Sequence, residues 1–181
     1  FIGTPFAFDS AYDINNAGNI VGSENVGNGI TKSYIINSDN TNPIYIETLG
    51  GRSSFARAIN NNNQVVGSAE YSLNNTFQHA FLYANGQLRD INGFNAPQSF
   101  AYDINDAGLI VGNINLTTFG DPRAFVHDGT TMRNLNSLIP QNSGWVLQEA
   151  RAINNNGQIV GKGTINNQTH AFLLNPNTAQ N

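Results

Sequence analysis

Four side chains with chemical potential occupy one position of a repeated pattern, immediately after an alanine. They are Tyr12, Arg57, Tyr102 and Arg151, and each tyrosine precedes an aspartate (Asp13, Asp103) where each arginine precedes an alanine. Guanidinium groups stack on aromatic faces and pair with carboxylates. The alternation therefore predicts Arg–Tyr stacking and Arg–Asp pairing between neighbouring units. The functional alternative is a polar central channel in which these residues hold an ion or a small ligand.

Two segments, 13–18 and 103–108, partly resemble the Asp-x-Asn-x-Asp-Gly calcium loop, but their fifth positions are Ala17 and Ala107. Calcium requires six to eight oxygen ligands with several carboxylates, so both segments are interpreted as hairpin turns. His79 and His170 share one repeat position and would lie on opposite sides of a ring of four units. We expect hydrogen-bonded, structural histidines, and we predict no metal site and no cofactor.

The sequence contains none of the common motifs of nucleophilic catalysis. It has no cysteine, no Gly-x-Ser-x-Gly nucleophile turn and no phosphate-binding loop. Its twelve acidic residues leave paired carboxylates for glycoside hydrolysis as the remaining catalytic alternative. We expect a protein that is not an enzyme.

Trp145 is the only tryptophan, and it lies in the longest insertion between repeats, 136–149. A single aromatic residue on an irregular loop can stack on a sugar ring or anchor a protein partner. Packing beneath the loop is the structural alternative.

These residues are carried by a fourfold repeat. Segments 11–22, 56–67, 101–112 and 150–161 align without gaps as Ala-(Tyr/Arg)-(Asp/Ala)-Ile-Asn, then a turn, then x-(Ile/Val)-Val-Gly. A second signature, mostly His-Ala-Phe or Arg-Ala-Phe, follows each one at 32–34, 79–81, 123–125 and 170–172. The chain is thus one repeat domain, 1–181, with units of about 11–55, 56–100, 101–149 and 150–176 after a closing strand and linker at 1–10.

Each unit predicts four antiparallel strands. A short strand ending in Ile, a tight Asn-Asn-x-Gly (or Asn) turn and a strand ending at Gly are followed by the strand of the second signature, a second turn and a last strand. Four-stranded units of this length are typical of propeller blades. We therefore predict an all-β fold, a small β-propeller of four four-stranded blades, with a stacked β-solenoid as the rival.

The fourth unit has no candidate for its last strand. We expect the N-terminal strand, Phe1–Ile2, to supply it and so remove an exposed sheet edge. The alternative is that these blades belong to a longer chain.

The repeats resemble the bacterial extracellular HAF repeats, which combine Leu-Gly-Gly, Ile-Asn-x-x-Gly-x-Val-Val-Gly and His-Ala-Phe segments. The resemblance is carried by segments 150–161 and 170–173 and by 49–51, and it covers nearly the whole chain. It implies an extracellular or cell-envelope setting in bacteria and no reaction. The departures at 32–34 and 123–125 argue against a family-wide ligand role for the histidine.

The composition narrows the possible partners. A net charge of −4 with eight scattered basic residues disfavours nucleic acid, and no apolar run is long enough to insert in a membrane. We expect a non-catalytic, secreted or envelope-associated binding or scaffold module whose partner is a protein. A multivalent lectin-like glycan binder and a self-assembling surface or filament subunit are the alternatives.

Overall fold

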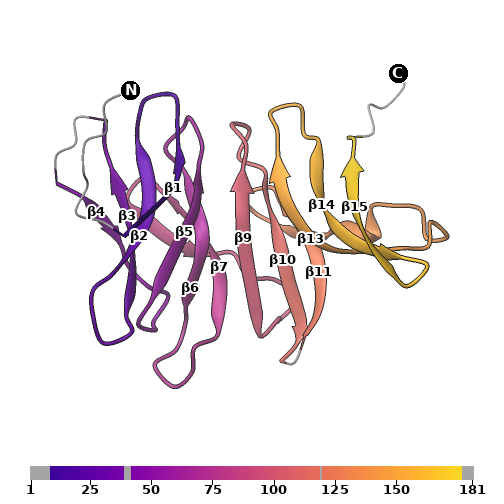
Figure 1. Cartoon of the computed structure of the whole chain (residues 1–181), viewed down its shortest axis with the longest axis horizontal. Helices are drawn as coiled ribbons and strands as arrows, with labels where there is room; N and C mark the ends of the chain where they lie inside the picture. Colours follow the sequence, from indigo (N-terminus) through magenta and orange to yellow (C-terminus); the bar gives the residue numbers. More distant parts are fainter. Residues whose placement is uncertain (1–8, 39–41, 119, 177–181) are drawn as a thin grey trace.

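The computed structural model describes residues 9–38, 42–118 and 120–176, and they form four antiparallel sheets in chain order (Figure 1). Sheet A contains β1 (Ser10–Ile14), β2 (Ile20–Asn25), β3 (Thr31–Ile36) and β4 (Ile44–Ile46). Sheet B contains β5 (Ser54–Ile59), β6 (Val65–Glu70), β7 (Gln78–Ala84) and β8 (Gln87–Asp90). Sheet C contains β9 (Gln98–Ile104), β10 (Ile110–Thr117), β11 (Gly120–His127) and β12 (Met132–Asn134), followed by the 3-10 turn η1 (Leu135–Ser137). Sheet D contains β13 (Trp145–Ile153), β14 (Ile159–Ile165) and β15 (Gln168–Leu174).

The turn between the first two strands of each sheet has the predicted conformation. Its last residue has a positive φ in all four sheets, 80° at Gly18, 58° at Asn63, 80° at Gly108 and 75° at Gly157. Glycine and asparagine adopt this left-handed region at the lowest cost. The repeated turn residues therefore fix the four hairpins locally.

A β-bulge interrupts the first strand of every sheet and lies at the Tyr/Arg position. In sheet B, for example, Ala56 pairs with Gly67 and Ala58 pairs with Val66, so Arg57 is skipped in the pairing of β5 with β6. The glycine opposite is required by contact, because a Cβ on Gly67 would lie 2.0 Å from the carbonyl oxygen of Phe55. We predicted these glycines at strand ends, and that prediction was wrong, since β6 continues to Glu70.

Consecutive sheets pack face to face through apolar side chains. We call the face that contacts the preceding sheet the leading face, and it is marked by the Ile before the turn. The opposite face is the trailing face, and it is marked by the Val that directly precedes the repeated Gly, at positions 21, 66, 111 and 160. At the B–C junction Val66 and Leu82 on the trailing face of sheet B meet Ala101 and Ile104 on the leading face of sheet C. Equivalent clusters fill the A–B and C–D junctions.

The four sheets form an open arrangement rather than a closed ring. Sheets A and D lie at opposite ends of the row (Figure 1), and within the described ranges no apolar cluster joins them. Counted over the described residues, sheet D has three strands, in agreement with the unfinished fourth unit. The predicted completing strand at Phe1–Ile2 lies outside the described residues.

Candidate functional site

Asparagine side chains connect the sheets at the ends of their first strands. The Asn15 amide donates to the carbonyl oxygen of Asn60 at 3.1 Å, Asn60 to that of Asn105 at 3.0 Å, and Asn105 to that of Asn154 at 3.1 Å. The Oδ1 atoms of the same side chains accept backbone N–H groups of their own turns, as Asn60 does from Gln64. Each asparagine therefore closes its own turn and binds the next sheet. We call this series of bonds the asparagine row.

A second row lies one residue further along the chain. The backbone N–H groups of Asn16, Asn61 and Asp106 donate to Asn61 Oδ1, Asp106 Oδ1 and Asn155 Oδ1 at 2.8–2.9 Å. The Asp106 carboxylate also receives the side-chain amides of Asn61 and Asn155, each at 2.9 Å. These hydrogen bonds, led by the backbone N–H of Asn61, hold the pKa of Asp106 below its usual 3.8.

The two aspartates of the alternating pattern bind backbone groups instead of arginine. The N–H of Ile59 donates to Asp13 Oδ2 at 2.8 Å, and that of Ile153 donates to Asp103 Oδ2 at 2.7 Å. Burial raises the pKa of Asp103 above its usual 3.8, and its backbone N–H partners oppose that shift. Among the described residues no Arg–Asp pair forms at these positions, so that part of the prediction was wrong. The two carboxylates instead accept backbone N–H groups of the next sheet.

The predicted Arg–Tyr stacking is present at two junctions. The Arg57 guanidinium lies 5.0 Å from the ring centre of Tyr12 across the A–B junction, and Arg151 lies 4.4 Å from that of Tyr102 across the C–D junction. Arg151 also forms an ion pair with Glu149. The alternation therefore links sheets A and B, and sheets C and D, as two pairs.

A polar depression of about 310 Å³ lies where the two rows meet the aspartates. Its lining includes Asp13, Asp103 and Asp106 with the adjoining asparagines, but not the four Tyr and Arg side chains. The polar groups there are already bound to one another and to backbone. The predicted Tyr12, Arg57, Tyr102 and Arg151 are therefore not part of the lining of this depression, and they form the Arg–Tyr contacts between sheets instead.

The outer edge of sheet D provides a different kind of site. In sheets B and C the third strand pairs with a fourth, as Leu82 pairs with Arg89 and Val126 with Arg133. Within the described ranges, the equivalent residue of β15, Leu173, pairs only with Val160 of β14. Strand β15 therefore presents a backbone edge to which no described residue pairs.

Two adjoining apolar hollows, with volumes of about 310 and 470 Å³, are lined in part by residues of β15. Both are lined by Ile139, Pro140 and Leu174, the first also by Trp145 and Phe172. We call the open edge of β15 together with these hollows the β15 groove. An unpaired strand edge beside apolar hollows is the arrangement that receives an extended peptide as an added strand.

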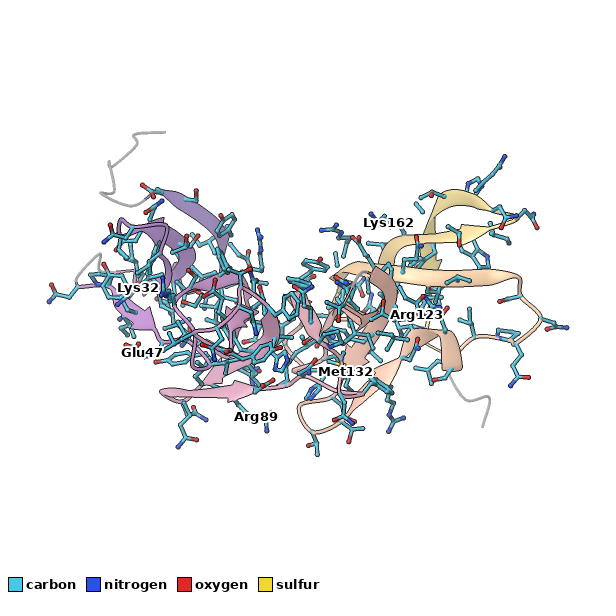
Figure 2. All side chains as sticks on the ribbon, turned by 90° about the horizontal axis from the view of Figure 1, so that it is seen from below. Lys32, Glu47, Arg89, Arg123, Met132 and Lys162 are labelled. Atoms are coloured by element: carbon cyan, nitrogen blue, oxygen red, sulfur yellow. The ribbon has the colours of Figure 1, made fainter. Side chains whose placement is uncertain are left out.

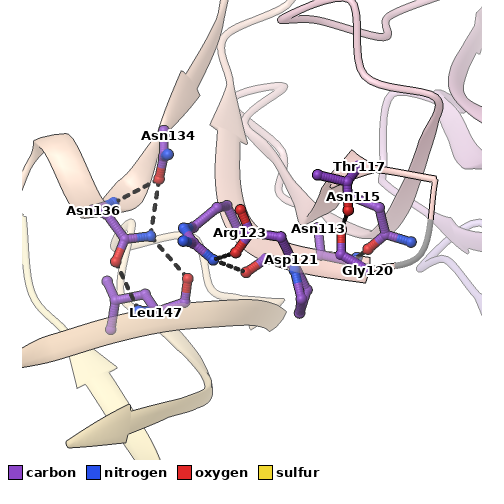
Figure 3. A network of polar contacts seen from close by, with 10 residues as sticks. Asn113, Asn115, Thr117, Gly120, Asp121, Arg123, Asn134, Asn136 and Leu147 are labelled. Carbon is purple, nitrogen blue, oxygen red and sulfur yellow. Dashed lines mark hydrogen bonds and ion pairs between the residues drawn. The ribbon is translucent and has the colours of Figure 1, made fainter.

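The insertion that forms one wall of the groove is held by Asn136 (Figure 3). Its side-chain amide donates to the carbonyl oxygen of Leu147 at 2.8 Å, and its Oδ1 accepts the Leu147 N–H at 2.7 Å. The Asn134 side chain in turn accepts the Asn136 backbone N–H at 2.9 Å. The insertion is therefore fixed to β13 by side-chain hydrogen bonds.

Trp145 belongs to a strand, which corrects the prediction of an irregular loop. It begins β13 and pairs with Ile165, because β14 extends far enough to pair with it. Its partly buried ring makes edge contacts with Phe172 and His170 at centroid distances of 6.5 and 6.4 Å. It thus both packs beneath the insertion and lines the groove.

His79 has the hydrogen-bonded, structural contacts that the sequence predicts. His79 Nδ1 lies 2.8 Å from Asp90 Oδ2, its Nε2 lies 3.2 Å from the Asn92 amide, and its ring stacks on Tyr71. No three His, Asp or Glu side chains in the described ranges group closely enough to hold a metal ion.

The basic residues labelled in Figure 2, Lys32, Arg89, Arg123 and Lys162, belong to four different sheets and are not gathered into one stripe. Within the described part of the chain, no helix is long and apolar enough to cross a membrane.

Comparison with solved structures supports the fold class that the sheets define, a β-propeller. The chain is similar to the β-propeller domain of the Trilobed protease from Pyrococcus furiosus, described as having an open velcro topology, with a TM-score of 0.53 and 11% sequence identity. The similarity covers 87% of this chain and 49% of that one, so the chain spans about half the length of the matched structure.

The chain belongs to a family described as proteins of unknown function, DUF3466, whose model matches residues 28–179. No curated protein sequence matches it.

Proposed function

We propose that the chain is a non-catalytic scaffold module, secreted or held at the bacterial cell envelope, which binds a partner protein by adding an extended strand in the β15 groove. The observation that carries the proposal is the edge of β15, unpaired among the described residues, beside two adjoining apolar hollows. The extracellular setting rests on the resemblance of the repeats to HAF repeats.

The non-catalytic part of the proposal rests on how the converging polar groups are used. Asp13 and Asp103 bind backbone N–H groups of the next sheet, and Asp106 is held by two asparagine amides. Side chains that are already paired in this way stabilise the junctions between sheets. Recognition of a partner is therefore assigned to the β15 groove.

The groove selects a particular kind of partner. The N–H of Ile91 donates to Ala80 O at 3.0 Å, so the partner strand of sheet B bonds through alternate residues. An added strand would use the same alternate amides and would place apolar side chains in the hollows. An extended segment with an apolar side chain on the face of the hollows, as Leu88 has in sheet B, fits these requirements.

A peptide that copies residues 86–93, which include β8, tests strand addition. We expect binding to change the fluorescence of Trp145, the only tryptophan. N-methylation at the positions of Arg89 and Ile91 removes the amides that would face β15 and should weaken binding at least about tenfold. N-methylation at Leu88 and Asp90, whose amides face away, is the matched control and should leave binding nearly unchanged.

A variant of the protein gives a second, independent test of binding in the groove. Ile139→Glu introduces a charge into both hollows and should weaken peptide binding, whereas Leu73→Glu, on an exposed loop of sheet B, should not. Equal weakening by both methylated peptides, or an unchanged affinity of Ile139→Glu, would show that strand addition in the groove is wrong.

A further inference from the structure

Both ends of the row of sheets expose the faces that every internal junction buries. Ile14, on the leading face of sheet A, is 60% exposed, whereas its three counterparts are 5–7% exposed. On the trailing face of sheet D, Val160 is 43% exposed and its three counterparts are fully buried. Leu173 on the same face is 57% exposed, against 7% for Leu82. These exposed positions are repeat positions whose neighbour is missing within the described residues.

We propose that a second copy of this chain covers these faces, so that the trailing face of sheet D of one copy packs on the leading face of sheet A of the next. The repeat itself identifies the partner, because each exposed face is one half of an interface that the chain already contains three times. The two exposed faces therefore carry the same repeat positions that pack against each other at the internal junctions.

The B–C junction is the template for this contact. Sheets B and D both carry Arg-Ala before the Ile, and sheets A and C both carry Tyr-Asp. A junction of sheet D with sheet A of the next copy thus repeats the order Arg-Ala then Tyr-Asp that is found from B to C. Ala152, Val160 and Leu173 would take the places of Ala58, Val66 and Leu82, and would meet Ala11, Ile14 and Ile20 in place of Ala101, Ile104 and Ile110.

The polar rows end in matching groups. At the B–C junction the Asn60 amide donates to Asn105 O at 3.0 Å, and the Asn61 N–H donates to Asp106 Oδ1 at 2.9 Å. Asn105 O also accepts the N–H of Gly108, as Asn15 O accepts that of Gly18, so the acceptor geometry is the same in sheet A.

At the free end of sheet D, the Asn154 amide bonds to Gln158 at 2.8 Å, just as Asn60 bonds to Gln64, and retains a second N–H. The Asn154 amide and the Asn155 N–H would therefore donate to Asn15 O and Asn16 Oδ1 of the second copy. Donors end one side of the molecule and acceptors end the other.

Such a contact is heterologous, because two different faces meet. Repetition of the contact closes a ring of copies or continues as a filament. We expect the purified chain to have a mass in solution of at least twice its 19.5 kDa, measured by light scattering after size-exclusion chromatography over a range of concentrations.

Two variants separate the faces. Ile14→Asp disables the leading face of sheet A, and Val160→Asp disables the trailing face of sheet D; both residues are exposed, so the fold should survive, with a cooperative melting transition as the check. Each variant alone should be a monomer. Leu73→Asp, an equally exposed apolar position away from both faces, is the matched control and should keep the mass of the wild-type chain.

The decisive measurement mixes the two variants. Ile14→Asp retains an intact trailing face and Val160→Asp an intact leading face, so an equimolar mixture should form a complex with one copy of each and no larger species. A wild-type chain that stays monomeric, variants that keep the wild-type mass, or a mixture that stays monomeric would each overturn the proposal. Peptide binding in the β15 groove is measured with other residues, so its failure leaves this result unaffected.

Discussion

Tyr12, Arg57, Tyr102 and Arg151 owe their position to backbone geometry. Each is the unpaired residue of a β-bulge, and in the strand opposite lies a glycine that leaves room for the displaced carbonyl group. The bulge turns the side chain towards the neighbouring sheet, where an arginine meets a tyrosine in two of the three junctions. These four side chains therefore help to hold neighbouring sheets together.

Gly67 gives the most direct test of the bulge. A methyl group at this position would lie 2.0 Å from the carbonyl oxygen of Phe55, which is backbone and cannot move away cheaply. We expect Gly67→Ala to lower the free energy of unfolding by about 2 kcal/mol or more, measured by urea denaturation. A loss below about 0.5 kcal/mol would contradict the close contact.

Asp106 predicts a dependence of stability on pH. Its pKa in the folded state lies below the usual 3.8, so the carboxylate stabilises the fold above that pH and the effect disappears as the pH falls through the lower, folded-state value. We expect Asp106→Asn to melt at a lower temperature than the wild-type chain at pH 6 to 7. The difference should shrink as the pH is lowered from about 5 to 3, and a difference independent of pH would argue against this role.

Strand order and turns could be predicted from the sequence because both depend on local residues. The positive φ of Asn63 follows from its place in the turn. The lengths of the strands could not be predicted, because they depend on the partner strand. Strand β13 begins as early as Trp145 because β14 extends to Ile165 and pairs with it there. Asparagine repeats at Asn15, Asn60, Asn105 and Asn154 on the printed sequence, yet its bond to the next sheet depends on the spacing between sheets.

The element that completes sheet D remains a prediction. If residues 1–8 supply the missing strand, their deletion should lower the thermal midpoint by several degrees, because a paired sheet edge and its apolar contacts are lost. Differential scanning calorimetry of the deleted and full chains measures this. An unchanged midpoint would remove the N-terminal segment as the completing strand and leave the β15 groove to a partner.

The molecule as a whole is a row of similar sheets with unlike ends. Its fold is that of a β-propeller, and it spans about half of the longer propeller it resembles. We propose the β15 groove as the site for an extended strand and the two end faces as the surface for another copy. Neither site could be predicted from the residues alone, because both arise where the repetition of the fold stops: the edge of β15 and the exposed Ile14 and Val160.

The asparagine row has a consequence for how the protein ages. Its three cross-sheet bonds each depend on an amide N–H that points at a carbonyl oxygen. Hydrolysis of such an amide to a carboxylate would replace the donor by a negative charge facing an acceptor, and asparagine is one of the thermolabile residues. Such damage at Asn15, Asn60 or Asn105 would remove a bond that joins two neighbouring sheets, and we expect it to loosen that junction while each sheet keeps its own backbone hydrogen bonds.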